Sequence, residues 1–289
     1  MRIATLSSGS GGNCVLIEGA GTTVLIDAGL PLKETRERAA DVGFELREVS
    51  EVLLTHEHSD HCAGAGVIAR KLGVTIRATE GTLQGLRDQP PVECQKPLRA
   101  GVPIRLGAAS SLSQGAMGLW AIPVAIPHDA AEPVAYVLEE RTPLGLSRAA
   151  VVTDLGSAPP EVVEALLGLD ALVLEFNHDL RMLIDGPYPP ALKARIRSRV
   201  GHLSNAQSAA LLMQLVNPGL AHVVLAHLSE HNNTPALAER AAEGVLIRMG
   251  CSAELTIGSQ TGAQEAIEVR PRPAFERRGA RQAAQLALL

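Results

Sequence analysis

The chain has 289 residues, of which 46% are hydrophobic and 2% aromatic, and a formal net charge of −5. This length allows one large hydrophobic core, and no linker, charge block or internal repeat divides it. The acidic balance argues against a surface coated with basic residues for nucleic acid, although it leaves room for a local basic path, and so few aromatic residues exclude widespread base stacking.

The N-terminal part predicts short strands around a glycine-rich loop. Residues 2–6 predict a strand and no signal peptide, because neither an apolar stretch nor a small-residue cleavage site follows. Residues 7–13 are rich in Ser and Gly but lack the Gly-Lys-Ser/Thr ending of a phosphate loop, and a strand at 14–18 follows them. They form either a hairpin loop that needs positive φ or a loop over a site. A strand at 22–26 then ends at Asp27.

The stretch Thr55-His56-Glu57-His58-Ser59-Asp60-His61 lies between an apolar strand at 51–54 and a helix at 62–72. Open α/β sheets place their ligand sites at such a strand end. His56 and His58 can turn toward one ion, and Asp60 and His61 toward a second. Imidazole suits zinc, manganese or iron. A polar turn capped by Ser59 or Asp60 is the simpler interpretation, but it does not explain three histidines in six positions of a chain that has nine.

Further strands end in polar side chains that bind metals or move protons: His128, Asp154, Glu175 and His227. Each is ambiguous alone, since a lone histidine is more often structural and an aspartate before glycine is common in turns. The strands that precede them are expected at 119–126, 149–153, 171–175 and 221–226. A hairpin joins the second of these to a strand at 133–140.

The other expected elements are read from hydrophobic periodicity and end signals. Thr234 is an N-cap before Pro235 at the first helical position. Gly201 ends a basic helix at the C′ position. Residues 176–190 read as irregular, and the signal over 92–113 predicts only short, broken strands. The remaining expected helices are 33–42, 80–86, 159–167, 191–200, 202–216 and 235–248, and the remaining strands are 74–78, 255–257 and 266–269.

The sequence of a strand, His-x-His-x-Asp-His and a helix resembles the central motif of the metallo-β-lactamase-fold hydrolases. The resemblance implies the α/β class, a four-layer αββα sandwich, and two divalent metal ions, with Zn²⁺ or Mn²⁺ expected. It implies that Asp27 orients the histidine turn. It also implies that Asp154 bridges two ions, with the ligands His56, His58 and His128 for one and Asp60, His61 and His227 for the other.

Three later stretches, 172–175, 201–207 and 225–229, occur in the order seen in tRNase Z. That resemblance implies that Glu175 orients His202 and that His202 is a general acid. The simpler interpretations are a charged strand end and a solvated ring at a helix start. The long exosite arm of tRNase Z is not evident.

The wider pattern is similar to the YycJ (WalJ) family over residues 1 to 262. The matching stretches include Ser8–Asn13, Phe176–Asp179 and His227–Pro235. This family implies a nuclease, with DNA exonuclease activity. His178 and Asp179 are then either near the site or simple loop residues.

Three functions follow as hypotheses. The first is a two-metal phosphodiesterase that degrades nucleic acid, DNA from an end, with Asp60, His202 and Glu175 as its catalytic residues. In this case the basic residues from Lys193 to Arg199 could follow phosphates, or they form a solvated face. The second is a small-molecule hydrolase acting on thioesters, lactones or cyclic phosphodiesters, which the acidic charge favours slightly. The third is a metal-binding protein without activity.

The bulk features also set the expected context. The four scattered cysteines predict reduced thiols in the cytoplasm, and no apolar run is long enough to cross a membrane. We expect one hydrolase domain over residues 1–270. Residues 271–289 are expected to form a loose C-terminal tail in which a helix at 282–289 is possible.

Overall fold

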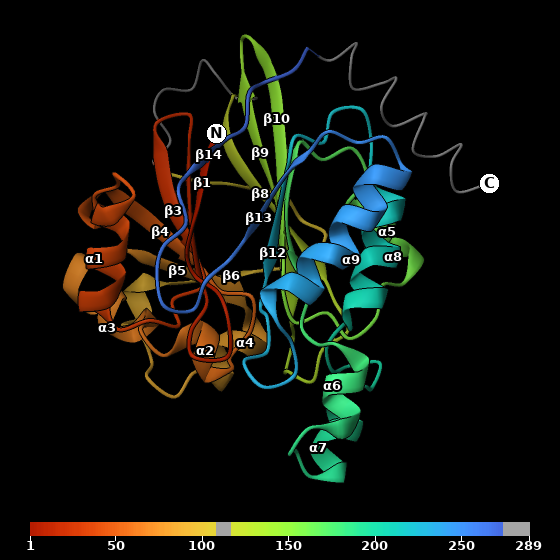
Figure 1. The fold of residues 1–289 in the computed structure, drawn as a ribbon. Coiled ribbons are helices and arrows are strands. Elements are labelled where there is room, and N and C mark those ends of the chain that lie inside the picture. Colours follow the sequence, from red (N-terminus) through yellow and green to blue (C-terminus); the bar gives the residue numbers. More distant parts are fainter. Residues whose placement is uncertain (108–116, 274–289) are drawn as a thin grey trace.

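The computed structural model describes residues 1–107 and 117–273. Within these ranges the chain forms two sheets of seven strands that pack face to face, with helices on the outer face of each (Figure 1). The four-layer αββα sandwich predicted from the sequence is confirmed. Among the described residues, no helix combines the length and apolar character needed to span a bilayer.

The first sheet is built mostly from the N-terminal part of the chain. Its parallel strands are β3 to β6, so these strands end at the same edge. In spatial order the strands are β14 (Ile267–Glu268), β1 (Arg2–Ser7), β2 (Cys14–Gly19), β3 (Thr22–Ile26), β4 (Val49–Leu53), β5 (Thr75–Thr79) and β6 (Gln95–Leu98).

The second sheet comes from the C-terminal part. Its parallel strands are β10 to β13, and an antiparallel hairpin joins β9 to β10. In spatial order the strands are β13 (Glu254–Ile257), β12 (His222–Ala226), β11 (Ala171–Glu175), β10 (Gly145–Val152), β9 (Val134–Thr142), β8 (Gly118–Ala125) and β7 (Ile104–Arg105).

The helices divide between the two outer faces (Figure 1). On the first sheet lie α1 (Leu32–Asp41), α2 (Ser59–Cys62), α3 (Ala65–Leu72) and α4 (Glu80–Gly85), with short 3-10 turns at Leu46–Glu48 and Val92–Cys94. On the second lie α5 (Pro160–Ala165), α8 (Asn205–Leu215) and α9 (Pro235–Arg248). Two short helices, α6 (Leu180–Asp185) and α7 (Pro190–Ile196), extend beyond the sheet at the lower end of the view.

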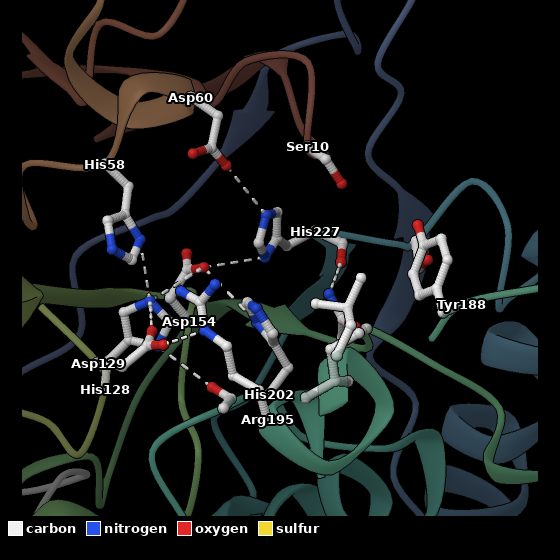
Figure 2. A pocket seen from close by; sticks show the side chains of 15 residues that line it. Ser10, His58, Asp60, His128, Asp129, Asp154, Tyr188, Arg195, His202 and His227 are labelled. Carbon is white, nitrogen blue, oxygen red and sulfur yellow. Dashed lines mark hydrogen bonds and ion pairs between the residues drawn. The ribbon is translucent and has the colours of Figure 1, made fainter. Parts of the chain in front are cut away.

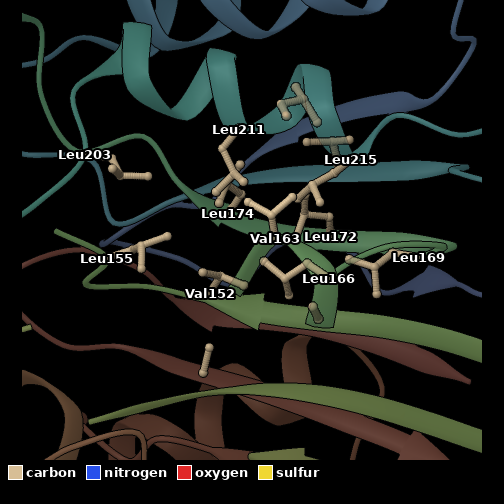
Figure 3. Packing of buried hydrophobic residues seen from close by; sticks show 14 of the residues in the cluster. Val152, Leu155, Val163, Leu166, Leu169, Leu172, Leu174, Leu203, Leu211 and Leu215 are labelled. Carbon is tan, nitrogen blue, oxygen red and sulfur yellow. The ribbon is translucent and has the colours of Figure 1, made fainter. Parts of the chain in front are cut away.

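Strand periodicity sorts the apolar residues into three clusters, because alternate side chains of a strand point to opposite faces. In β11, Val173 points between the sheets, whereas Leu172 and Leu174 pack under α5 and α8 (Figure 3). In β1, Ile3 points inward and Leu6 outward. Strands buried on both faces therefore read as continuous apolar runs, and their first polar residue marks the strand end.

Side-chain caps fix where two helices begin: α9 starts at the expected residue, whereas α8 starts at Asn205 and not at the expected residue 202. The Thr234 side chain accepts a hydrogen bond from Leu237 N, and α9 begins at Pro235 as predicted. Ser204 and Gln207 form a capping box that starts α8. The other expected strands and helices are present, with bounds within a few residues of those predicted. β6 and β7 correspond to the weak strand signal over 92–107.

Four local predictions are wrong. The 176–190 stretch is not irregular, because Asp179 caps α6 by accepting a hydrogen bond from Met182 N. The expected 62–72 helix is two short helices. The basic helix ends at Ile196 instead of Val200, so Gly201 is not its C′ residue. Gly201 instead lies in a tight return of the chain, where a Cβ would come within 2.3 Å of the Ile196 carbonyl oxygen.

The predicted tail is partly attached to the domain. Arg272 pairs with Leu146 through two backbone hydrogen bonds and forms an ion pair with Asp170. Residues 108–113 of the expected broken strands and residues 274–289 of the tail, with its possible helix, lie outside the described residues.

Tyr136 joins the core between the sheets to the end of β4. Its side chain is fully buried, and its hydroxyl donates to the Leu54 carbonyl at 2.8 Å. We expect Tyr136→Phe to lower the free energy of unfolding by about 1–2 kcal/mol, because the Leu54 carbonyl loses its buried partner. Urea unfolding measures this, with the exposed Leu144→Ala as the unaffected control. An unchanged free energy would contradict the role of this bond.

Candidate metal centre and active site

Polar residues at the ends of six strands come together around one cleft of about 210 Å³, and some of them, such as His58, Asp60 and Asp154, line it (Figure 2). The parallel strands of both sheets end at this edge, where α/β proteins place their sites. The contributing positions are Asp27 after β3, Thr55–His61 after β4, His128 after β8, Asp154 after β10, Glu175 at the end of β11 and His227 after β12.

Three of these turns use a backbone conformation that is rare for residues other than glycine. The φ angles of Asp27, Asp154 and His227 are +61°, +57° and +53°. In the described part of the chain, Ala20 is the other non-glycine residue with positive φ. Such strain is concentrated at functional sites, where surrounding structure holds it in place.

His56, His58 and His128 form one group, in which one nitrogen from each ring lies within 4.8 Å of the others. The Nδ1 of His56 lies 3.0 Å from Thr55 Oγ1, while its Nε2 is buried without a hydrogen-bond partner in the described structure. His58 Nδ1 and His128 Nε2 face each other at 3.3 Å, and the other nitrogen of His128 lies 3.2 Å from the Gly201 carbonyl. Ring nitrogens that converge in this way fit a shared cation.

Asp60, His61 and His227 form a second group with the same spacing. Asp27 lies 2.7 Å from His61 Nδ1, so His61 Nε2 points into the cleft, 3.4 Å from Asp60. His227 Nε2 lies 3.5 Å from Asp60. A carboxylate behind an imidazole fixes its tautomer and direction, as is usual for histidines that bind metals.

Asp154 lies among the imidazoles of both groups. Its carboxylate is 3.0 Å from His61, 3.4 Å from His227 and 3.8 Å from His128. Burial alone raises the pKa of a carboxyl, but the facing His227 and His61 hold the pKa of Asp154 well below its usual value. In return, burial works to lower the pKa of His61, and Asp154 and Asp27 more than offset this and raise it well above the usual value.

The donors fit divalent metal ions. Neutral imidazole nitrogens and carboxylate oxygens are the ligands of zinc, manganese and iron in proteins. His56 Nε2 has no hydrogen-bond partner among the described residues, and the His58 and His128 nitrogens face each other. The lone pairs of these nitrogens are therefore available to a cation. Asp60 and Asp154 supply the negative charge that balances the cation.

Glu175 and His202 form a pair beside Asp154. Glu175 is fully buried, and its Oε1 lies 2.7 Å from His202 Nδ1 and 3.2 Å from His227 Nδ1. Its other oxygen accepts from the Leu155 and Leu203 backbone amides. Although burial raises the pKa of a carboxyl, His202 lowers that of Glu175 to about 2. Burial lowers and Glu175 raises the pKa of His202, with a net rise.

All nine residues predicted as site residues therefore come together at this edge: His56, His58, Asp60, His61, His128, Asp154, Glu175, His202 and His227. Their roles as ligands and catalysts stay predictions. His222 lies away from the cleft and faces Glu254. The Cys62 thiol donates to the Glu57 carbonyl and packs under the helices.

The loop residues whose roles were ambiguous in the sequence have different positions in the structure. Asp179 is a helix cap. His178 is buried, its backbone pairs with Ser204 next to His202, and burial lowers its pKa to about 4. His231 is exposed and its ring contacts Tyr188.

The glycine-rich loop contributes two contacts that the sequence reasoning did not single out. Ser8 Oγ accepts from the His227 amide at 2.6 Å, and Asn13 Nδ2 lies 3.0 Å from His61 Nε2. The loop therefore lies over the site. Its polar, glycine-rich composition was the available signal. Arg195, which pairs with Asp129 beside His128, was also missed as a cleft residue.

Comparison with known proteins agrees with this geometry. Residues 8–171 match the model of the metallo-beta-lactamase superfamily. The chain belongs to this superfamily. It is 33% identical over 253 residues to the protein named exodeoxyribonuclease YycJ of Bacillus anthracis, covering 86% of this chain and 90% of that one. It is 29% identical to exodeoxyribonuclease WalJ of Streptococcus pneumoniae, with 89% and 91% covered.

A solved structure supports the fold. The metallo-beta-lactamase fold protein YhfI of Bacillus subtilis superposes with a TM-score of 0.65 at 15% identity, covering 91% of this chain and 98% of that one. Family membership and the His/Asp cluster together make this chain a metal-dependent hydrolase that uses divalent metal ions.

The Asp27 carboxylate orients the His61 ring of the second ligand group. We expect Asp27→Asn to weaken Zn²⁺ binding about ten- to a hundredfold, because the amide cannot accept at both positions and the His61 ring is released. Asparagine tolerates the left-handed backbone at this position, so the fold should persist. Calorimetric titration with Zn²⁺ measures this, with the exposed Asp41→Asn as control. Equal affinity in both variants would show that Asp27 does not support the site.

Proposed function

We propose that this chain is a metal-dependent nuclease that removes nucleotides from an end of DNA. The observation that carries the proposal is Asp154 placed between two ligand groups and beside the Glu175–His202 pair. The chain's 33% identity to a protein named exodeoxyribonuclease favours DNA over other phosphodiesters.

In this proposal His56, His58 and His128 would hold one ion and Asp60, His61 and His227 the other, with Asp154 as a ligand that the two would share. We propose Zn²⁺ or Mn²⁺, because five of the seven ligands are imidazoles. Two such ions lower the pKa of a water toward about 7 and stabilise charge that develops on a phosphate.

The Glu175–His202 pair supplies the proton for the leaving oxygen. His202 lines the cleft, and Glu175 holds its Nδ1, so its Nε2 is the nitrogen free to donate. Because Glu175 raises the pKa of His202, the ring keeps its proton to a higher pH than an ordinary imidazole does. A protonated imidazole beside the scissile bond can protonate the sugar oxygen that leaves, because an alkoxide is a poor leaving group without a proton.

Exposed basic residues and a second hollow lie next to the cleft, and they leave room for a nucleic-acid strand. Arg197 and Arg199 are exposed and form no ion pair with any described residue, and Arg195 borders the cleft through its ion pair with Asp129. A second hollow of about 610 Å³ shares His58, Asp60 and Arg195 with the cleft. These cations can follow the phosphates of a strand whose end is at the metals.

We also propose that residues 1–270 form one hydrolase domain, with residues 271–289 as its C-terminal tail. The core between the sheets supports this, since it includes residues from Ile3 to Val269. A cytoplasmic location is proposed from the cysteines, which are free in the structure.

The nuclease proposal is tested with end-labelled DNA and RNA, bis-p-nitrophenyl phosphate and a panel of thioesters and lactones, each with Zn²⁺, Mn²⁺ and Mg²⁺. We expect hydrolysis of the phosphodiesters, with DNA shortened from an end. Asp60→Ala should lose activity by more than about a hundredfold, because removing a ligand costs more than removing its support. The exposed Asp41→Ala should retain it.

Ester turnover without phosphodiester turnover would instead support a small-molecule hydrolase. Metal binding without turnover of any substrate would support a protein without activity. Full activity of Asp60→Ala would refute the proposed site.

The pH dependence of turnover tests the general acid. His202 acts in its protonated form, so activity should decline as the pH rises through its pKa, which Glu175 raises. In Glu175→Gln the pKa of His202 falls, the protonated form is lost at lower pH, and the alkaline decline of kcat should move to lower pH. The measurement is kcat against pH at saturating metal and DNA.

A second readout separates this role from a structural one. A p-nitrophenolate leaving group needs no proton, so His202→Gln should lose much more activity on DNA than on bis-p-nitrophenyl phosphate. Equal losses on both substrates would exclude His202 as the acid.

A further inference from the structure

His202 lies on a segment without helix or strand structure, between the end of α7 at Ile196 and the start of α8 at Asn205. Glu175 and His227, in contrast, lie at the ends of buried strands. Glu175 Oε1 is 2.7 Å from His202 Nδ1 and 3.2 Å from His227 Nδ1, so both rings turn toward one oxygen. The two rings stand side by side in the cleft, with centroids 5.3 Å apart (Figure 2). Three segments of the chain must therefore keep fixed relative positions.

Two buried asparagines join the segments of the two histidines. The Asn205 and Asn233 side chains are each 5% exposed and form two reciprocal hydrogen bonds. Asn205 Nδ2 donates to Asn233 Oδ1 at 2.8 Å, and Asn233 Nδ2 donates to Asn205 Oδ1 at 2.9 Å. Asn205 comes shortly after His202, and Asn233 lies in the loop that begins with His227. The pair thus connects the segment of the general acid to the segment of a proposed metal ligand.

The third segment, which follows β11, is bound to the same pair. Asn233 Nδ2 also donates to the Phe176 and Asn177 carbonyls at 2.7 and 3.1 Å. The Asn205 backbone amide donates to the His178 carbonyl at 2.8 Å. Buried amides are costly to leave without partners, so these contacts specify one arrangement of the three segments.

We propose that Asn205 is a positioning residue for the general acid: through Asn233 it holds His202 where its Nε2 can reach the leaving oxygen. The inference rests on the proposed function and adds to it the contact that places the acid. Proton transfer requires the ring within hydrogen-bond reach of that oxygen. A misplacement of about 1 Å can lower a rate about a hundredfold.

The other contacts of Asn233 make the effect of Asn205 selective. When Asn205 is truncated, Asn233 Nδ2 keeps the Phe176 and Asn177 carbonyls, and its Oδ1 keeps the hydrogen bond from Thr234 N at 2.9 Å. The loop after β12 therefore stays attached to the end of β11, and the proposed metal ligands keep their places. In contrast, the segment before α8 loses its side-chain link to that loop. Loss of Asn205 should impair the acid and spare metal binding.

The experiment compares variants of the full chain on two phosphodiesters. Asn205→Ala should lower kcat on DNA about tenfold to a hundredfold and lower kcat on bis-p-nitrophenyl phosphate much less, because p-nitrophenolate leaves without a proton. In a chain that already carries His202→Gln, the same substitution should cause no further loss on DNA, since the group that it positions is gone. Calorimetric titration of Asn205→Ala should show the wild-type affinity for Zn²⁺.

Asn217→Ala is the matched control. Asn217 is also a buried asparagine, 4% exposed, and its side chain donates to the Leu169 and Leu215 carbonyls at the other end of α8. This variant should keep the wild-type kcat on both substrates. Thermal unfolding checks that each variant folds. Asn205→Ser, whose hydroxyl ends one bond short of the lost nitrogen, replaces Asn205→Ala if that variant does not fold.

Several results would overturn the positioning inference alone. These are a wild-type kcat in Asn205→Ala, equal losses on both substrates, a further loss on DNA when His202→Gln is present, or a weakened affinity for Zn²⁺. A chain that folds with neither substitution would also overturn it, because the pair would then be a requirement of folding and not of catalysis. If the wild type cleaves no DNA, or His202→Gln loses equally on both substrates, the proposed function fails and this inference fails with it.

Discussion

The carboxylate of Asp154 is buried at the edge where the two sheets end, and its charge must be balanced there. A buried charge without a partner costs several kcal/mol. Glu175 is buried beside it, and Asp27 is buried on the other side of the His61 ring. Hydrogen bonds from backbone amides satisfy Glu175 and Asp27 in part. For Asp154 the facing groups are imidazoles, so protons on those rings or metal ions must supply the positive charge. The arrangement of the strand ends therefore suits a site that binds divalent cations.

The backbone conformation at these strand ends reflects the same need to bring charged side chains together. The left-handed conformations at Asp27, Asp154 and His227 each cost about 1–3 kcal/mol and are maintained by the rest of the structure. Each follows a strand that is buried on both faces, and the sandwich fixes where that strand ends. Packing of the apolar clusters therefore holds the turns that direct the polar side chains into the cleft. Stability resides in the three cores, and chemistry resides in the residues just beyond them.

Much of the fold and of the site could be predicted because the sequence signals for them are local. A buried strand followed directly by a histidine or an aspartate indicates a strand end at a sheet edge, and the Thr55–His61 stretch contains four such residues within one turn. The start of α9 followed from Thr234 and Pro235 alone. In contrast, the contact of Ser8 with His227 joins residues 219 positions apart, and the pair of Arg195 with Asp129 joins residues 66 positions apart. No periodicity or spacing encodes such pairs. The shortened helix before Gly201 was missed for a related reason: the glycine permits a close approach of backbone segments, which in sequence looks the same as a helix end.

The chain's acidity limits how it can hold a nucleic acid. With a net charge of −5, the surface as a whole repels phosphates, so binding of a nucleic acid must depend on local groups of cations. The cations that do lie near the cleft are on and after α7, which extends beyond the sandwich (Figure 1). Two divalent ions would add four positive charges at one point, next to this short basic segment. Attraction is then concentrated at a single phosphate and its close neighbours. A charge distribution of this kind favours a short contact close to the cluster over a long contact along a nucleic acid.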